Sequence, residues 1–380
     1  MTAPIRATFL TVMPAPYMQD LFAAMRDDGR IIPRVLYMEM AAPDTYWGRR
    51  TLPPNETVLD GRWFSILGGR VHWNRGVLAA LRGSASDIHV ISGYSSLTCQ
   101  AAVQWLRATG RPWVFLGERP AMRSRRLAGR MLREIAAATG LRSAGGVAAV
   151  GSEATETYRQ RCRARIPVQN IPYYTDIATF SENPAKPGSI PNRIRVLYCG
   201  QLIHRKGVDL LVRAISQLAV RCPHVTLDLV GEGPLRHELQ ESIPLEYRRR
   251  FTFHGFSNVE ALPAYFSSAD LFVLPSRHDG WGVVVNQALA AGLPIVASDA
   301  VGAARDFVAD RGTGRIVPAG DVDRLAGAIE YFATHPDVLR SCGAAARTVA
   351  GELSLQTGVA NWLSLFRDVL DRSSAPRNPA

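Results

Sequence analysis

The sequence predicts an α/β protein with two doubly wound parallel sheets, and three observations carry this prediction. At 380 residues the chain exceeds one typical domain, so we expect two domains. Short apolar runs alternate with segments of helical length through both halves, which is the pattern of repeated strand–helix units. Residues 181–192 are polar and rich in Pro, Gly and Ser, and we predict that they link the two halves.

The first half of the chain alternates strands and helices. We expect strands at residues 6–12, 33–38, 87–91, 113–116, 147–150 and 168–171, and helices at 17–26, 97–109, 122–138 and 153–163. Residues 39–84 are irregular, and we predict only a weak strand near 63–67 there.

The second half repeats the pattern more clearly. We expect strands at 195–199, 226–230, 251–254, 271–274, 294–297 and 315–317, with helices between most of them and terminal helices at 337–349 and 358–370. The predicted organisation is an N-terminal domain (1–180), a linker (181–192), a C-terminal domain (193–354), a C-terminal helix (355–371) and a disordered tail (372–380). Whether the C-terminal helix crosses back to the first domain stays open at this point.

The composition bounds the class of protein without choosing a function. Hydrophobic residues make up 47% and charged residues 20%, as is ordinary for a globular protein, and no window has the roughly 18 apolar residues of a membrane span. The five cysteines are scattered without CxxC spacing, which argues against a disulfide framework or a zinc site and fits a cytoplasmic protein. The net charge of +11 is compatible with nucleic acid, an anionic membrane or phosphorylated substrates.

The segment 271–298 is the strongest candidate for a binding site. It consists of an apolar run at 271–274, a polar loop at 275–282 that contains Gly280 and Gly282, a helix at 283–291 and a second apolar run. The loop lies at the carboxyl end of a strand and at the amino end of a helix. Open α/β sheets bind ligands at such positions, and the free N–H groups and dipole of the helix favour anions.

Three other strand ends in the second half carry similar glycine-containing turns. Residues 200–207 place Arg205 and Lys206 before a helix, and a diphosphate clamp and a solvated basic turn remain equal alternatives for them. Residues 231–234 are as compatible with a structural turn as with a ligand contact, and 254–256 fit a capped strand end better than a nucleobase contact. Because parallel strands end at one edge of a sheet, we expect all four turns to lie together.

A series of motifs follows in order through the second half: GQLIHRKGVDLL, LVGEGP, FTFHG, PSRHDGWGVVVNQALAAGLPIVAS, VGAARDFV and GRIVPAGD. With them the chain resembles the family 4 (group 1) glycosyltransferases of the GT-B type, strongly over about 190–350. The first half resembles them weakly, through APYMQDLF and the turn 171–176. The resemblance implies two Rossmann-like domains that face each other across a cleft, with the acceptor on the first and a nucleotide-sugar on the second.

The resemblance also implies an activity and a set of site residues. It implies transfer of a sugar (an EC 2.4 reaction) from a nucleotide-diphospho-sugar to a glycan or lipid-linked acceptor, with retention, in polysaccharide or lipopolysaccharide biosynthesis. The implied catalytic residues are Lys206, Arg205, Asp279 and Glu118. The implied donor-binding residues are Gly200, Gln201, Gly231, Gly255, Gly280, Trp281, Gly282 and Gln287, and the acceptor-side residues are Tyr17, Gly93 and Tyr94. No cofactor and no metal are expected, since fixed cations would neutralise the leaving diphosphate.

The chain departs from the family pattern at three positions. The family usually has two glutamates eight residues apart, where this chain has Asp279 and Gln287. Asp279 keeps the carboxylate on a shorter side chain, whereas Gln287 accepts hydrogen bonds more weakly than a carboxylate. Gln201 stands where the phosphate clamp usually has an arginine. Glu118 occupies the region of a usual histidine, and an acceptor-side role and an ion pair with a neighbouring arginine both remain open.

The predicted helix at 122–138 is rich in arginine, with Arg119 to Arg133 close together in the sequence. A basic amphipathic helix is able to lie on an anionic membrane on the cytoplasmic side, and a solvated face is the alternative. Two other functions share the predicted architecture: a sugar-nucleotide epimerase and a non-catalytic sugar-nucleotide-binding or scaffold protein. Nucleic acid is not an expected partner, because the basic helix has no interleaved aromatic residues.

Overall fold

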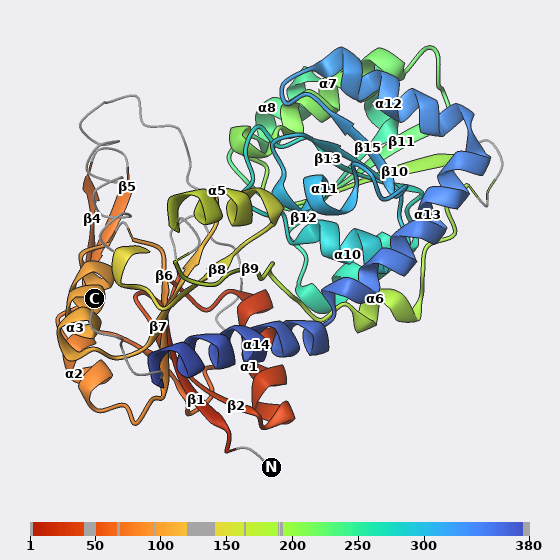
Figure 1. Ribbon diagram of the computed structural model, residues 1–380. Helices are drawn as coiled ribbons and strands as arrows, with labels where there is room; N and C mark the ends of the chain where they lie inside the picture. The colour runs from red at the N-terminus through yellow and green to blue at the C-terminus, as the bar shows by residue number, and fades with distance from the viewer. Residues whose placement is uncertain are drawn as a thin grey trace. The chain divides into compact units, whose positions relative to one another are not determined.

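The computed structural model describes residues 3–41, 51–66, 69–94, 96–119, 141–162, 165–188, 190 and 193–374. The chain divides into two compact units (Figure 1). Unit 1 comprises Met1–Tyr173 and Leu355–Ala380, and unit 2 comprises Tyr174–Ser354. Each unit is built on one parallel sheet with helices, so the predicted class of two doubly wound α/β domains is confirmed. No helix in the described ranges is long and apolar enough to cross a membrane.

Unit 1 has a seven-stranded sheet in the order β3-β2-β1-β6-β7-β8-β9. Its strands are β1 (Ile5–Thr11), β2 (Ile31–Tyr37), β3 (Glu56–Val58), β6 (Ile88–Ser92), β7 (Trp113–Gly117), β8 (Gly146–Ala149) and β9 (Val168–Asn170). Its described residues form the helices α1 (Pro16–Asp28), α2 (Val77–Arg82), α3 (Leu97–Thr109), α5 (Ser152–Cys162) and α14 (Leu355–Ser374). The weak strand predicted near 63–67 is the first arm of a separate antiparallel hairpin, β4 (Arg62–Ile66) and β5 (Gly69–Trp73).

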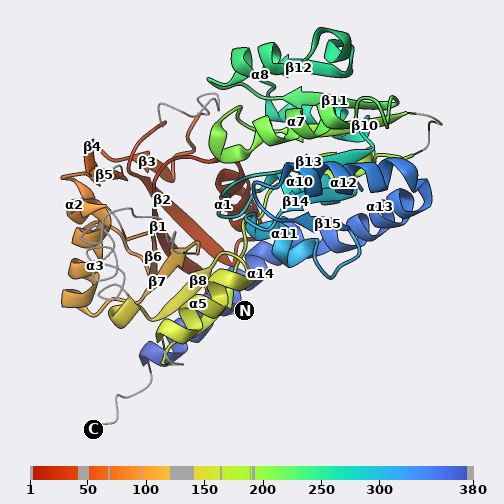
Figure 2. The ribbon, with the colours of Figure 1, turned by 90° about the horizontal axis from the view of Figure 1, so that it is seen from above.

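Local signals set the ends of the helices that cover this sheet. Pro16 begins α1, and Gly29 ends it in the left-handed region at φ 76°. The Ser96 hydroxyl accepts a hydrogen bond from the Cys99 N–H and caps α3. Figure 2 shows α2 and α3 on one side of the sheet and α1 and α14 on the other. The predicted helix at 122–138 lies outside the described residues.

The C-terminal helix α14 belongs to unit 1 because its aromatic side chains complete that core. The ring of Phe9 on β1 lies 4.9 Å from Phe22 of α1 and 5.4 Å from Trp362 of α14. The indole of Trp362 is buried. The helix continues to Ser374, so the predicted tail at 372–380 is still helical at its start; residues 375–380 lie outside the described part.

Unit 2 has a six-stranded parallel sheet in the order β12-β11-β10-β13-β14-β15. Its strands are β10 (Ile194–Cys199), β11 (Val225–Val230), β12 (Phe251–Gly255), β13 (Leu271–Leu274), β14 (Ile295–Ser298) and β15 (Gly314–Val317). Its α-helices are α6 (Ala178–Glu182), α7 (Val208–Leu218), α8 (Arg236–Ser242), α9 (Leu262–Ser267), α10 (Val284–Ala290), α11 (Gly302–Phe307), α12 (Val322–Thr334) and α13 (Pro336–Ala350). Four 3-10 turns complete it: η1 (His204–Lys206), η2 (Leu245–Arg250), η3 (Val259–Ala261) and η4 (Gly351–Leu353).

The segment predicted as the linker, 181–192, is packed against unit 2 as far as it is described. The Phe180 ring lies 5.2 Å from Phe266, and the Ala185 N–H donates to the Ala291 carbonyl at 2.8 Å. The Gly188 N–H donates to Asp270 Oδ1 at 2.9 Å. The boundary between the units therefore falls at Tyr173, earlier than the polar composition of residues 181–192 predicts. The buried Phe180 ring and hydrogen bonds from backbone N–H groups fix the residues after it to unit 2.

Candidate functional site

The sheet of unit 2 brings the predicted turns to one edge. β10 lies between β11 and β13, and all the strands run in parallel, so the turns after β12, β11, β10 and β13 are neighbours. The chain leaves β10 toward β11 and returns later to β13 on the other side. The loops 200–207 and 275–282 therefore flank the topological switch point, which is the position where open α/β sheets bind ligands.

Lys206 and Asp279 meet at this switch point. Lys206 Nζ lies 2.6 Å from Asp279 Oδ2, and the two side chains are only 13% and 10% exposed. The loops approach closely because Gly207 adopts φ 68° and has no side chain; a Cβ there would lie 2.1 Å from the Pro275 carbonyl oxygen. The ammonium group is thus held beside a carboxylate at the carboxyl ends of β10 and β13.

Arg277 connects the same two loops. Its guanidinium donates to both carboxylate oxygens of Asp209, at 2.6 and 2.7 Å, and to the His204 carbonyl at 2.8 Å. Asp209 stands in the first turn of α7, directly after Gly207 and Val208. The fork-shaped guanidinium suits such a bidentate contact and fixes the loop that carries Lys206.

Arg205 is also turned toward the second loop. Its guanidinium donates to the His278 carbonyl at 3.1 Å, and its own carbonyl accepts from the Arg277 N–H at 2.9 Å. The side chain is exposed, so this cation lies at the surface next to the Lys206–Asp279 pair. Two cations from neighbouring positions of one turn are therefore available to an anionic ligand at this edge.

The turns after β10 and β11 lie against each other through their backbones. The Leu202 N–H donates to the Glu232 carbonyl at 2.9 Å. Gly231 is at φ 142°, and a Cβ there would lie 1.9 Å from the Gly200 carbonyl oxygen. Gly255 is at φ 79°, and its carbonyl accepts a hydrogen bond from the Gly231 N–H at 2.8 Å. Gly200, Gly231 and Gly255 therefore allow three adjacent strand ends to pack closely, whatever else they contact.

Two of the predicted donor-binding side chains point inward. Trp281 is 1% exposed, its indole N–H donates to Asn286 Oδ1 at 3.3 Å, and its ring packs on Phe307. Only its backbone is therefore open to the predicted donor contact. Gln287 is buried on α10, at the position where the resembled family has its second glutamate. Gly282 is at φ 88° with Asp279 Oδ2 among its nearest atoms, which places the glycine turn beside the ion pair.

The main chain of Gln201 also takes part in this edge. Its carbonyl accepts the Tyr198 hydroxyl at 2.7 Å. Gly280 lies against the start of α11, where a Cβ on Gly302 would be 2.4 Å from the Gly280 carbonyl oxygen. The Asp279 N–H donates to the Ala300 carbonyl at 3.0 Å, so the loop 275–282 is fixed on the β14 side as well as on the β10 side.

Unit 1 carries a polar and aromatic cluster at the carboxyl ends of its strands. Glu118, directly after β7, accepts the Tyr173 hydroxyl at 2.9 Å through Oε1, and its carbonyl accepts the Tyr158 hydroxyl at 2.9 Å. The Tyr173 ring lies 4.7 Å from Tyr17 of α1. Burial and the nearby Glu118 charge raise the pKa of Tyr173, so its hydroxyl stays a donor at neutral pH.

The other predicted acceptor-side residues follow the neighbouring strand. Gly93, at φ 80°, donates its N–H to the Leu116 carbonyl at 3.0 Å and so lies beside the end of β7. Tyr94 stacks on Phe115 with the ring centroids 6.0 Å apart. Tyr17, Gly93, Tyr94 and Glu118 therefore belong to adjacent strand ends of one unit.

Arg119, the residue after Glu118, pairs with Glu153 of α5. The arginines from 123 to 133, on which the membrane hypothesis rests, lie outside the described residues. Asp321 caps α12 by accepting the Arg324 N–H at 2.9 Å. Across the described ranges, no cluster of three or more His, Cys, Asp and Glu side chains is arranged to hold a metal ion.

The sequence predicts no role for three residues of these sites. Arg277 lies in the predicted polar loop 275–282 and Tyr173 in the turn 171–176, while Asp209 lies outside both. Tyr173 had a usable signal, since it follows the last strand of unit 1 as Glu118 follows β7. The Arg277–Asp209 pair had none, because its partners are separated by 68 positions and only the parallel sheet brings them together.

Sequence comparisons with known proteins concern mainly unit 2. Residues 179–349 match the family model described as glycosyl transferases group 1. The chain is 30% identical over 182 residues to alpha-D-kanosaminyltransferase of Streptomyces kanamyceticus, covering 47% of each. It is 31% identical over 194 residues to the GDP-mannose-dependent alpha-(1-6)-phosphatidylinositol monomannoside mannosyltransferase of Mycolicibacterium smegmatis, covering 47% of this chain and 50% of that one. The chain spans about half the length of the curated relatives it matches.

Solved structures resemble the chain over nearly its whole length. Sucrose-phosphate synthase from Thermosynechococcus elongatus has a TM-score of 0.73 at 22% identity, covering 97% of this chain and 100% of that one. Anabaena HepE in complex with UDP has a TM-score of 0.74 at 19% identity, and the match covers 96% of this chain and 100% of that one. WaaG, described as a glycosyltransferase of lipopolysaccharide biosynthesis, has a TM-score of 0.65 at 15% identity, covering 97% and 100%. These likenesses confirm the predicted GT-B fold.

Proposed function

We propose that this chain transfers a sugar from a nucleotide-diphospho-sugar to an acceptor, because residues 179–349 match the family model of the group 1 glycosyl transferases. The observation that carries the proposal is the Lys206–Asp279 pair at the switch point of unit 2, with Arg205 beside it. The resembled solved structure of HepE contains UDP, and the resembled mannosyltransferase is GDP-mannose-dependent, which supports a nucleoside diphosphate group on the donor.

The cations at this edge match the charge that develops when a diphosphate leaves. Lys206 and Arg205 would neutralise the leaving group, aided by the positive end of the dipole of α10, which follows the same loop. We propose that these fixed cations make a divalent metal unnecessary. Asp279 would hold Lys206 in position before the donor arrives and then face the sugar, whose anomeric configuration would be retained.

We place the acceptor on unit 1. The Glu118 carboxylate and the Tyr173 hydroxyl are hydrogen-bonding groups of the kind that orient a sugar hydroxyl, and Tyr17 adds an aromatic surface. The acceptor class in this proposal is a glycan or a lipid-linked glycan of polysaccharide or lipopolysaccharide biosynthesis. A cytoplasmic location, with peripheral contact to the membrane, belongs to the same proposal.

A donor screen tests the activity. The full chain is incubated with UDP-, GDP- and other sugar nucleotides, and release of the nucleoside diphosphate is measured with Lys206→Ala, Asp279→Asn and Lys186→Ala variants. Lys186 is the other lysine of the chain and is exposed, so its variant is the matched control. We expect Lys206→Ala to lower turnover by about 100-fold, near 3 kcal/mol, while Lys186→Ala leaves it unchanged. If no sugar nucleotide binds or is turned over, the proposal that this chain is a transferase is refuted.

Gln287 favours one second candidate, a non-catalytic sugar-nucleotide-binding protein. It is buried where the resembled family has a glutamate, and an amide accepts hydrogen bonds less strongly than a carboxylate. The same screen separates the two functions. Nucleotide-sugar binding without turnover in the native chain, together with turnover gained by Gln287→Glu, would favour the binding protein.

A further inference from the structure

The hairpin of β4 and β5 exposes aromatic side chains on both of its faces. Trp63, Phe64 and Trp73 are 43%, 49% and 38% exposed. Phe64 pairs with Val71 and Trp73 pairs with Arg62, whereas Trp63 pairs with His72. Since side chains alternate along a strand, Phe64 and Trp73 share one face and Trp63 lies on the other. The hairpin forms a separate two-stranded sheet (Figure 1), so these rings do not cover the main sheet of unit 1.

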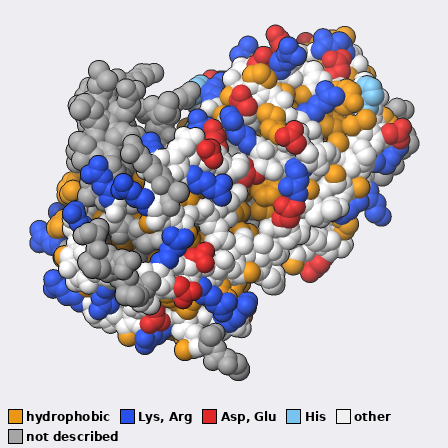
Figure 3. Space-filling view, viewed as in Figure 1, with side chains coloured by type: hydrophobic (Ala, Val, Ile, Leu, Met, Phe, Trp, Pro, Cys, Tyr) orange, Lys and Arg blue, Asp and Glu red, His pale blue; other side chains and the backbone are white. Residues whose placement is uncertain are grey.

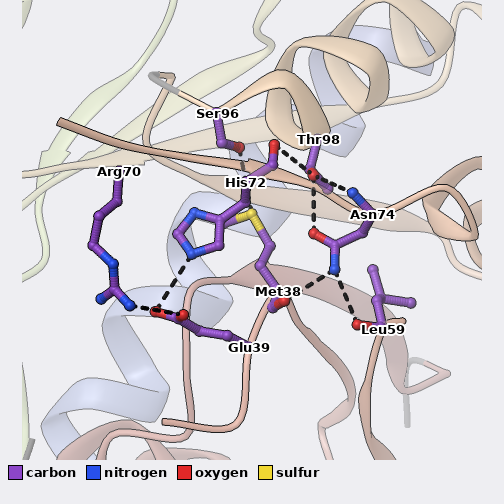
Figure 4. A network of polar contacts seen from close by, with 8 residues as sticks. All are labelled: Met38, Glu39, Leu59, Arg70, His72, Asn74, Ser96 and Thr98. Carbon is purple, nitrogen blue, oxygen red and sulfur yellow. Dashed lines mark hydrogen bonds and ion pairs between the residues drawn. The ribbon is translucent and has the colours of Figure 1, made fainter. Parts of the chain in front are cut away.

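The base of this hairpin is fixed by a buried polar network (Figure 4). The Asn74 amide follows β5 and donates to the carbonyls of Met38 and Leu59, both at 2.9 Å. Its Oδ1 accepts the Thr98 hydroxyl at 2.9 Å. Asn74 and Thr98 are fully buried, so the exposed rings stand on a rigid support rather than on a loose loop.

A second set of contacts fixes the β5 strand itself. Arg70 lies 3.1 Å from Glu39 Oε2, and His72 Nε2 lies 3.4 Å from Glu39 Oε1. The same Arg70 guanidinium covers the Trp63 ring, 4.5 Å from its centroid. Arg70 therefore holds one exposed ring in place while Glu39 neutralises its charge.

The remaining charges of the hairpin are positive. Arg62 and Arg75 are exposed, and neither forms an ion pair within the described part of the chain. The described strands of the hairpin carry no acidic residue, and Asp60 precedes them in the sequence. Basic side chains are spread over the face of the molecule that Figure 3 shows. Exposed aromatic rings next to arginines form the composition that suits the boundary between water and an anionic membrane.

We propose that the β4–β5 hairpin docks on the surface of an anionic lipid bilayer, with Phe64 and Trp73 at the level of the headgroups and Arg62 and Arg75 on the lipid phosphates. A second copy of the chain fits this surface less well, because it would bring the same exposed arginines together. An uncharged glycan would leave the arginines without a role. This inference rests on the peripheral membrane contact of the proposed function; the docking element is in unit 1 and does not depend on the donor site of unit 2.

Co-sedimentation of the full chain with vesicles tests this surface. Vesicles of phosphatidylcholine alone are compared with vesicles that also contain phosphatidylglycerol. We expect binding to the anionic vesicles, weakened about tenfold by Phe64→Ala or Trp73→Ala and about fivefold by Arg62→Ser or Arg75→Ser. The matched control is Val220→Ala with Leu245→Ala, two side chains of unit 2 that are 77% and 74% exposed, and it should bind as the native chain does.

Tryptophan fluorescence provides a second measurement. Anionic vesicles should shift the emission to shorter wavelength, and Trp73→Phe should remove most of that shift, whereas Trp63→Phe, on the other face, should leave it. Donor turnover in solution should be unchanged in every hairpin variant, so a failed docking experiment is distinguishable from a failed transferase proposal. Native affinity for anionic vesicles in the Phe64 and Trp73 variants, or no vesicle binding by the intact chain, overturns the proposal. Loss of a self-associated form in these variants assigns the surface to a second copy and overturns it as well.

Discussion

Replacing Arg277 or Asp209 should weaken unit 2 and loosen the loop that carries Lys206. Arg277 makes two bonds to Asp209, at 2.6 and 2.7 Å, and a third to the His204 carbonyl. Hydrogen bonds to charged groups contribute about 1.5–3 kcal/mol, and exposed ion pairs about 0.2–1 kcal/mol. The side chains are 22% and 26% exposed, so we expect a coupling energy of about 1–2 kcal/mol between the two residues.

The Arg277–Asp209 ion pair, called here the Arg277–Asp209 clamp, depends on pH through the pKa of the Asp209 carboxyl. Burial is the largest single influence and would raise the pKa of the carboxyl. The hydrogen bond and charge of Arg277, a backbone hydrogen bond and the nearby His204 together outweigh it, so the pKa lies below the ordinary 3.8. A carboxyl with a lowered pKa in the folded state stabilises the fold above its unfolded pKa. This contribution is lost as the pH falls through the folded value, so the clamp should be intact at neutral pH and fail only in strong acid.

A double-mutant cycle in urea measures the coupling energy. The free energy of unfolding is determined for the native chain, Arg277→Ala, Asp209→Ala and the double variant. Arg277→Lys is the control that keeps the charge and loses the bidentate geometry. We expect the KM for the donor to rise more than kcat falls, because the clamp positions Lys206 and does not touch the substrate. A coupling energy below about 0.5 kcal/mol, or an Arg277→Lys variant equal to the native chain in stability and KM, would refute this reasoning.

Three further predictions concern other parts of the fold. Gly207→Ala should destabilise unit 2 by more than Gly320→Ala in urea unfolding: both glycines have positive φ, but only at Gly207 would the Cβ meet a carbonyl, 2.1 Å away. Equal losses would show that the loops do not need their close approach. Burial, with a smaller contribution from Arg111, lowers the pKa of His89 to about 4. Between pH 6.5 and 4 the unfolded chain therefore binds more protons at this residue than the folded chain does. Stability should therefore fall by up to about 3 kcal/mol over that range, and His89→Gln should flatten the slope. Trp362→Ala should cost about 3–5 kcal/mol in unit 1 because the indole is buried against Phe9; a loss below 1 kcal/mol would show that α14 does not complete that core.

The strand and helix pattern of the chain was largely predictable, because it depends on local periodicity. Every strand predicted in unit 2 occurs there within a few residues of its expected bounds, and the Gly-containing turns follow the predicted strand ends. The hairpin β4–β5 was not predicted as such. Its second strand follows a run of aromatic and glycine residues that has no clear alternation, and its base depends on Asn74 contacts with distant backbone groups.

The boundary between the units shows where composition is a poor guide. Residues 181–192 have the polar, Pro- and Gly-rich character of a linker, yet the described part of that segment is docked on unit 2. The deciding residue is Phe180, just before the segment, whose ring is buried against Phe266. One such contact outweighs a polar composition, since it removes a large apolar side chain from water.

By itself the sequence determined two doubly wound sheets and the turns that carry Arg205, Lys206 and Asp279, since these features follow from local spacing and composition. Only the tertiary structure decided which of them meet. The 2.6 Å contact of Lys206 with Asp279 joins positions 73 residues apart, and the neighbouring Arg277–Asp209 clamp joins positions 68 apart. The physical reason is the strand order, which places β10 beside β13 and brings the two loops to the same edge of one parallel sheet.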